Sequence, residues 1–336
     1  MPVLTHFKRI WTWYLRASLA VPFGVIVLLV LAKTGNFTAR MALVETRQIL
    51  FGVRFDDTSF LRAAPSRLQE QYGFKAYEPG SIEPYRSGVI SALHRDSLQG
   101  RIVDADRWAF DVTQTFSGFG GRACGEYADL LDAMQRLARG SEGCCSDHTM
   151  VFLAVANFDG VFARELHNAE HTFVEYWNPM EERYVWLDPY LGLRAKSKGR
   201  YVGVSDMLDL IDQGETWEFE FVGAENPVRR IDVRKVKGLR PQDFVKVGMT
   251  LGNDVYAEDR AVRDLRFFPR PVAQALMLIS GKQAPIGFSY DRMLPHRPLG
   301  YYYGYIRYLL IFQAIITCVA VFGVARGFVR HRHPTV

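Results

Sequence analysis

Two uncharged apolar runs, 17–32 and 308–325, lie near the ends of the chain. As helices rising about 1.5 Å per residue they would be about 24 Å and about 27 Å long, against a hydrocarbon core of about 30 Å. Aromatic and basic residues flank both runs, as they do at the interfaces of membrane-spanning helices. The pattern predicts transmembrane helices over 17–33 and 305–326, with a basic segment at 1–16 and a basic tail at 327–336.

Each run has an alternative. The first could be a cleaved signal peptide, since three basic residues precede it, and the second could be a buried core helix. If both span, the termini share one side of the membrane and residues from roughly 34 to 304 lie on the other. Basic residues flank the first run on both sides, so the positive-inside count is nearly even, but a basic N-terminus favours cytoplasmic termini. We expect an inner (cytoplasmic) membrane protein with an extracytoplasmic main domain.

Between these runs the hydrophobic period changes from helical to two. The pattern predicts helices over 104–115, 125–138 and 145–157, and the last is apolar all round at 150–156, which indicates burial. It then predicts consecutive antiparallel strands at 161–166, 171–177 and 184–188. The expected fold class is α+β. The expected divisions of the main domain are a helical and loop part at 34–118, a core at 119–192, and an extension with a juxtamembrane region at 193–304.

The net charge of +5 is concentrated at the termini, because no acidic residue precedes Glu45 or follows Asp291. No basic run interleaved with aromatic residues occurs in the middle, so the sequence predicts no nucleic-acid partner. Lys196, Lys198 and Arg200 form a basic loop that is either solvated or in contact with an acidic envelope polymer.

One cysteine begins the predicted buried helix. Of the four, Cys318 lies in the second apolar run, which leaves Cys124, Cys144 and Cys145. An odd number leaves at least one thiol unpaired, and a Cys124–Cys144 disulfide would leave Cys145 free. At a helix N-terminus the free N–H groups and the helix dipole favour a thiolate, and the same groups can donate to an oxyanion.

His171 and Asp188 can supply the base and the group that orients it. If their strands form a hairpin, opposed residue numbers sum to 359, which pairs the two directly, or to 361, which pairs Asp188 with Phe173. Either odd sum places both on one face of the sheet, whereas an even sum separates them. Asp188 could instead simply open a turn before Pro189. We predict Cys145 as nucleophile, His171 as base and Asp188 as orienter.

Four segments resemble motifs of the transglutaminase-like superfamily, whose core is that of papain-like cysteine enzymes. They are Gly143-Cys-Cys145-Ser-Asp-His-Thr149 for Gly-x-Cys-x-Asp-His-Ala, 160–164 for Gly-Ile-Pro-Ala-Arg, His171-Thr-Phe-Val-Glu175 for His-Ala-Trp-Val-Glu, and Trp186-Leu-Asp188-Pro for a Trp-then-Asp-Pro ending. The resemblance covers about 121–192 and is to membrane-anchored bacterial-type members. It implies a papain-like core, with the cysteine helix packed on an antiparallel sheet and flanked here by the two transmembrane helices.

The resemblance also implies Cys–His–Asp chemistry on amides of a peptide or protein substrate, by hydrolysis or acyl transfer, without a cofactor. Segment 160–164 lacks the family's proline and the connection 164–171 is short, so the substrate groove is expected to be reshaped. Trp108 lies upstream, where some members place a tryptophan that assists the oxyanion.

Other thiols and imidazoles compete for these roles. Cys124 lacks the Gly-x-Cys spacing and is expected to be packed or disulfide-bonded. His148 lies one turn beyond Cys145 and is either a buried structural histidine or a catalytic one, whereas His167 is expected to be solvated. A zinc site from Cys145, His148 and His171 would not follow a common zinc spacing, so no metal is predicted.

Two functions follow from these patterns. The first is a membrane-anchored cysteine peptidase or acyltransferase. The second is a catalytically silent transglutaminase-like scaffold in envelope or exopolysaccharide assembly, with an envelope polysaccharide or membrane-protein partner.

Overall fold

A computed structural model describes residues 52–78, 104–116, 127–140, 143–168, 171–222, 238–245, 247–265, 270–289 and 311–319, and the single positions 27, 233, 236, 267, 308 and 322. The chain divides into two compact units, one of Val53–His296 and one of Met1–Gly52 with Arg297–Val336. The sheet and the candidate site described below belong to the unit Val53–His296.

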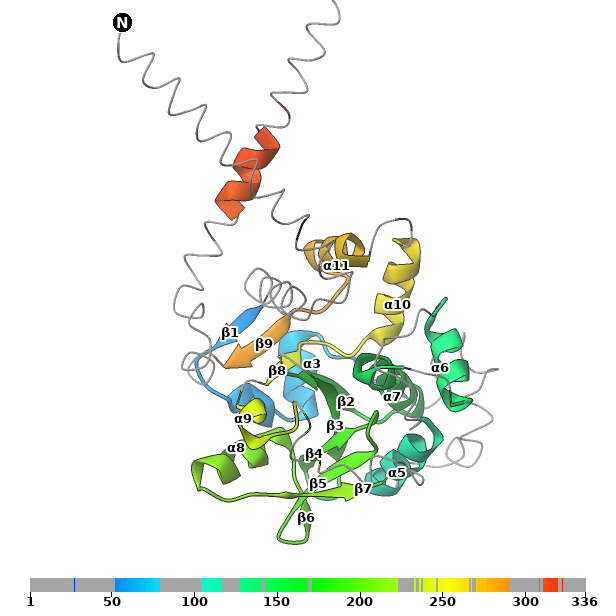
Figure 1. The fold of residues 1–336 in the computed structure, drawn as a ribbon, viewed down its shortest axis with the longest axis vertical. Coiled ribbons are helices and arrows are strands. Elements are labelled where there is room, and N and C mark those ends of the chain that lie inside the picture. The colour runs from blue at the N-terminus through cyan, green and yellow to red at the C-terminus, as the bar shows by residue number, and fades with distance from the viewer. Residues whose placement is uncertain are drawn as a thin grey trace, which may run out of the picture. The chain divides into compact units, whose positions relative to one another are not determined.

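A mixed sheet organises this unit (Figure 1), in the order β1-β9-β8-β2-β3-β4-β5-β6, with β7 also paired to β5. Its strands are β1 (Val53–Phe55), β2 (Ala163–His167), β3 (Thr172–Asn178), β4 (Arg183–Asp188), β5 (Leu193–Ser197), β6 (Arg200–Tyr201), β7 (Glu218–Phe221), β8 (Gly248–Thr250) and β9 (Ile286–Ser289). β1 and β9 are parallel, and the other pairs are antiparallel. Strands from before and after segment 119–192 therefore extend the three central strands that the period-two pattern predicts.

Helices cover both faces of this sheet. They are η1 (Ser59–Arg62), α3 (Pro65–Tyr72), α5 (Ala105–Phe116), α6 (Leu130–Ala138), α7 (Cys145–Asp159), α8 (Val204–Asp212), α9 (Pro241–Phe244), α10 (Val255–Asp264) and α11 (Arg270–Ile279). α7 begins at the residue that the sequence predicts and continues two residues further. It ends at Gly160, whose φ of 74° is the left-handed conformation common after a helix.

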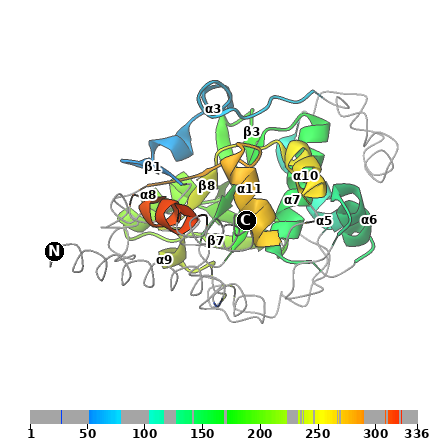
Figure 2. The same ribbon diagram turned by 90° about the horizontal axis from the view of Figure 1, so that it is seen from above.

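Alternation along the strands divides the apolar residues into two cores. Val174, Val185 and Leu187 face the core that contains α5, α6 and α7, whereas Phe173 and Trp186 face the core that contains η1, α3 and α8. α7 contacts α5, α6, α10 and strands β2 and β3 (Figure 2). This arrangement explains why α7 has no polar face.

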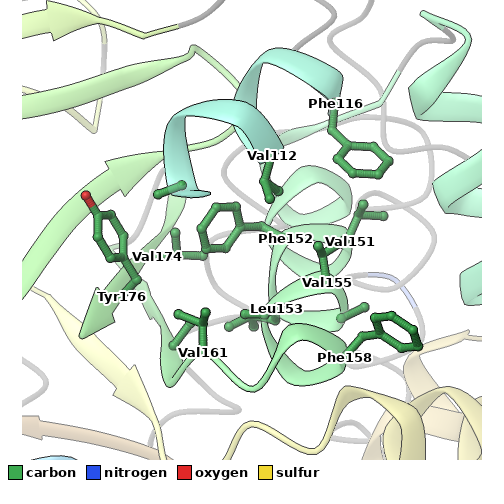
Figure 3. Close-up of a cluster of buried hydrophobic side chains, with 14 of the residues drawn as sticks. Val112, Phe116, Val151, Phe152, Leu153, Val155, Phe158, Val161, Val174 and Tyr176 are labelled. Carbon is green, nitrogen blue, oxygen red and sulfur yellow. The ribbon is translucent and has the colours of Figure 1, made fainter. Parts of the chain in front are cut away.

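The first core fixes the axis of α7 (Figure 3). Phe152 lies between Val112 of α5 and Val174 of β3, and each of these side chains is almost completely buried. Burying a side chain of this size contributes about 1.5–3 kcal/mol. Buried polar groups on the helix are bonded as well, since Asn157 Nδ2 donates to Asn253 O at 2.7 Å. The helix that carries Cys145 is therefore held along its length.

Within the part of the chain that the structure describes, no helix is long and apolar enough to cross a membrane. This finding contradicts the predicted fold class with flanking transmembrane helices and the predicted inner-membrane location. Of the two predicted spans, 17–33 lies outside the described residues except for residue 27, and 305–326 is described only at 308, 311–319 and 322.

Candidate active site

Cys145 is the first residue of α7, and a capped helix start holds it there. The preceding residue, Cys144, is the N-cap in an extended conformation (φ −100°, ψ 175°). Its carbonyl accepts hydrogen bonds from Asp147 N at 3.0 Å and His148 N at 3.2 Å. The Asp147 carboxylate in turn accepts from Cys144 N at 2.9 Å, so that carboxylate lies at the positive end of the helix dipole. Cys145 itself has a free, half-buried thiol.

The register between β3 and β4 brings His171 and Asp188 together. Val174 pairs with Leu187, so opposed numbers sum to 361, one of the two registers that the sequence left open. The imidazole Nε2 lies 2.7 Å from Asp188 Oδ2. The other carboxylate oxygen accepts N–H bonds from Tyr190 at 3.0 Å and Leu191 at 3.1 Å. Asp188 therefore opens a turn and also holds the imidazole, so both readings of this residue apply.

A loop around Gly238, which the sequence does not point to, holds the backbone of His171 in place through Asn168. His171 N donates to Asn168 Oδ1 at 2.9 Å, and Asn168 Nδ2 donates to Gly238 O at 2.8 Å. Gly238 N donates to Asp243 Oδ2 at 2.9 Å, which holds the loop in place. A Cβ at position 238 would lie 2.5 Å from His171 Cβ, so only glycine fits. The sequence offers little signal for this contact, because 67 positions separate the two residues.

Mutual contact shifts the pKa values of the thiol and the imidazole. Burial raises the pKa of Cys145, but the hydrogen bond and charge of His171 and the Thr172 N–H group outweigh burial and lower it overall. Burial lowers the pKa of His171, but the Asp188 charge and hydrogen bond, with the contact to Cys145, raise it to about 10. Because Nε2 is bonded to Asp188, Nδ1 is the nitrogen that faces the thiol. The arrangement favours a thiolate–imidazolium pair.

The end of β4 explains why the Thr172 amide reaches the thiol. Asn168 N donates to His171 O at 3.0 Å, so in the antiparallel pattern the Thr172 N–H group points away from β2. In this register Pro189 would lie opposite Thr172, but β4 ends at Asp188. The amide is thus available to the sulfur. Beside it, Ser146 Oγ lies 3.4 Å from Thr172 Oγ1.

A buried ion pair fixes the strand that carries His171. Arg164 on β2 and Glu175 on β3 are cross-strand partners, both fully buried, and Arg164 Nε donates to Glu175 Oε2 at 2.8 Å. The guanidinium also lies 3.5 Å from the centre of the Tyr184 ring. The second carboxylate oxygen of Glu175 accepts from Val204 N at the start of α8. Through Glu175, four residues after His171, these bonds connect β3 to β2 and to the start of α8.

The structure argues against the oxyanion role that the resemblance raises for Trp108, and the expectation that His167 is solvated is wrong. Trp108 Nε1 donates to Asp159 at 2.7 Å, at the end of α7 opposite Cys145 and about 21 Å along the helix, so it cannot assist an oxyanion there. His167 is buried at the end of β2 and is not solvated. His148 is buried, packs 5.3 Å from the Tyr190 ring, and has its pKa lowered by burial, which agrees with the structural reading.

The cysteine and charge expectations have mixed outcomes. Cys144 is disulfide-bonded, whereas its expected partner Cys124 lies outside the described residues. Each cation of the basic loop has a carboxylate partner, which weakens the case for an acidic polymer: Lys196–Glu220 at 3.2 Å, Lys198–Glu215 at 2.8 Å and Arg200–Glu181 at 3.8 Å. Among the described residues no group of three or more His, Cys, Asp or Glu side chains could hold a metal ion.

Comparisons with protein-family models, with curated proteins and with solved structures return no match. The likeness to transglutaminase-like enzymes therefore stays a prediction that rests on the four sequence motifs. The structure brings Cys145, His171 and Asp188 together, and their catalytic roles remain a prediction as well.

Proposed function

We propose that the protein is a transglutaminase-like cysteine enzyme that cleaves or transfers the acyl group of a peptide or protein amide. The observation that carries this proposal is the chain of contacts from Asp188 through His171 to the thiol of Cys145 at a helix start. A carboxylate, an imidazole and a thiol in this order provide an orienter, a proton carrier and a nucleophile.

The reaction follows from the charge states. The Cys145 thiolate attacks the amide carbonyl carbon, and the imidazolium of His171 gives its proton to the departing nitrogen as the C–N bond breaks. A thioester remains on the sulfur. The neutral imidazole then takes a proton from water or from a primary amine as that nucleophile attacks the thioester carbonyl. The C–S bond breaks, the Cys145 thiolate leaves beside the renewed imidazolium, and the product is an acid or a new amide. Asp188 holds the imidazole throughout.

Backbone amides can stabilise the oxyanion of each tetrahedral intermediate. Among the first-turn amides of α7, those of Asp147 and His148 are bonded to Cys144 O. The Cys145 and Ser146 amides precede them at the positive end of the helix dipole, where they can donate to a developing negative charge. Removing one such donor typically lowers kcat by about 10²–10³.

Alkylation with iodoacetamide near pH 6 tests the nucleophile. We expect rapid modification of Cys145, resolved by peptide mass spectrometry, and slow modification of the exposed Cys318 in the same chain. His171→Ala should reduce the Cys145 rate to that of Cys318, because the thiolate loses its partner. Slow labelling of both thiols that does not depend on His171 would contradict the proposal and favour a silent scaffold.

The amide chemistry needs a separate assay. We expect Cys145-dependent turnover on a panel of unstructured peptides that contain glutamine and backbone amides, with and without an added alkylamine. Incorporation of the amine would identify acyl transfer, and an acid product alone would identify hydrolysis. The Cys145→Ser protein, which keeps the shape of the site, is the control, and equal turnover by that variant would refute the assignment.

A further inference from the structure

The nucleophile lies directly beside a cysteine whose sulfur is already in a covalent bond. Cys144 is disulfide-bonded and buried, whereas Cys145 is a free thiol. Cys144 is the extended N-cap residue and Cys145 is the first helical residue, so the two sulfurs leave the chain from backbone of different conformation. The proposed mechanism uses the sulfur of Cys145 and gives no role to the sulfur of Cys144.

The disulfide lies at the residue that sets the start of α7. The carbonyl of Cys144 accepts two first-turn amides, and its N–H group donates to Asp147. Any movement of this residue is therefore passed to the peptide that carries Cys145. A covalent bond at the N-cap restrains that movement more than hydrogen bonds alone, and cysteine is not among the residues that cap helices well.

We propose that Cys144 is a positioning residue whose disulfide holds the Cys145 sulfur in contact with His171 and the Thr172 amide, so that reduction of this bond lowers the reactivity of the nucleophile. The inference rests on the proposed function and adds its regulation. A protein of this kind is active when the compartment or the buffer is oxidising, and it loses activity in the reductants that usually protect catalytic thiols.

Reduction by an added phosphine defines the chemistry. The phosphine attacks one sulfur of the disulfide and the S–S bond breaks. Water converts the phosphonium intermediate into a phosphine oxide and supplies two protons, so both cysteines become thiols. Phosphorus loses the two electrons that the sulfurs gain. Cys145 takes no part, and any loss of its reactivity then reports on geometry.

The test compares full-length wild type with a protein that lacks the bond. The variant Cys124→Ser/Cys144→Ser removes Cys144 together with its expected partner. Serine is a preferred N-cap residue, so the helix keeps a good cap while the covalent restraint is lost. Trp108→Phe is the matched control, because it removes a buried hydrogen bond at the opposite end of the same helix. Iodoacetamide rates at Cys145 are measured from pH 5 to 10, at a temperature where circular dichroism shows all three proteins native.

We expect the midpoint of the rate–pH profile to rise by about one unit in the double variant. The rate should fall about tenfold at any pH well below both midpoints, because the thiolate fraction there falls tenfold per unit. Trp108→Phe should lower the melting temperature and leave the midpoint unchanged, which separates positioning from general destabilisation. Wild type treated with the phosphine should behave as the double variant does, and tandem mass spectrometry separates labels on Cys144 and Cys145.

Two results overturn the inference and can be told apart. If the double variant and the reduced wild type keep the wild-type midpoint while His171→Ala still abolishes rapid labelling, the disulfide does not position the nucleophile and the proposed function stands. If the oxidised wild type shows no rapid labelling that depends on His171, the proposed function fails, and this inference fails with it.

Discussion

Replacing Asp188 by asparagine isolates the charge that supports the imidazolium. Asparagine has nearly the same shape, and its oxygen can still accept the amides of Tyr190 and Leu191 that now bind Oδ1. The contact to His171 Nε2 at 2.7 Å would lose its negative partner. Burial, which lowers the pKa of His171, would then have less to oppose it.

The size of the effect follows from the pKa of His171. The difference between its ordinary value of 6.5 and about 10 corresponds to about 5 kcal/mol at 1.36 kcal/mol per pH unit. Asp188 contributes more to this shift than Cys145 does, and both also offset the effect of burial, so about half of the total, or about 2–3 kcal/mol, is a lower bound for Asp188. Losing this amount would lower the equilibrium constant for forming the thiolate–imidazolium pair about 50- to 100-fold.

The assay is the rate of iodoacetamide alkylation of Cys145 at pH 6. Asp159→Asn is the control, because it neutralises another buried carboxylate at the far end of α7 and keeps an oxygen for Trp108. We expect a slower rate in Asp188→Asn, by up to about 50- to 100-fold where the neutral pair becomes the major form, and less than a twofold change in the control. Equal rates in the wild type and Asp188→Asn would show that the carboxylate does not set the charge state of the site.

Two further predictions concern stability. Glu175→Gln leaves Arg164 buried without a counter-ion and should lower the free energy of unfolding in urea by about 3–5 kcal/mol. Glu220→Gln, at a more exposed pair, is the control and should lower it by at most about 1 kcal/mol. Equally small losses in both variants would refute the role of the buried pair. In a Cys145→Ala background, the stabilisation by Asp188 should be fully present below pH 6.5 and lost as pH rises through the raised folded pKa of His171, since the folded state keeps a proton that the unfolded state releases. Urea titrations of Cys145→Ala with and without Asp188→Asn measure this difference, and a gap that widens above pH 6.5 would contradict it.

Local sequence patterns were sufficient to predict that the three candidate catalytic residues, Cys145, His171 and Asp188, share one site. The helix start at Cys145 follows from a continuous apolar run after a glycine-bounded break, and strand parity puts His171 and Asp188 on one face. The alternation of side chains could not decide between the two registers in which opposed residue numbers sum to 359 or to 361. The choice depends on the turn, where Asn178 Oδ1 accepts amides from Met180 at 3.0 Å and Glu181 at 3.3 Å.

Contacts between distant segments were not predictable in the same way. β1, β8 and β9 are three or four residues long, too short for a period-two pattern to stand out, and they extend the sheet beyond β2. The position of Trp108 relative to Cys145 could not be predicted either, for a related reason. Its helix was predicted, but sequence order does not say which end of α7 that helix approaches, and the indole meets Asp159 and not the nucleophile.

The loop at Gly238 provides a test of how closely the base must be held. Alanine there would place a Cβ 2.5 Å from His171 Cβ, and ordinary contact begins at 3.4 Å, so the base or the loop must move by about 1 Å. A displacement of this size at a catalytic group can cost about 10²-fold in rate. The substitution also strains the backbone, because φ is +88°, and Gly199→Ala separates the two effects: its φ is +81°, with open space around the added carbon. Both variants should lose similar backbone stability, but only Gly238→Ala should slow alkylation of Cys145 by one to two orders of magnitude, or about 10–10². If both variants were alkylated at the wild-type rate, the close approach of this loop would not matter for the position of the imidazole.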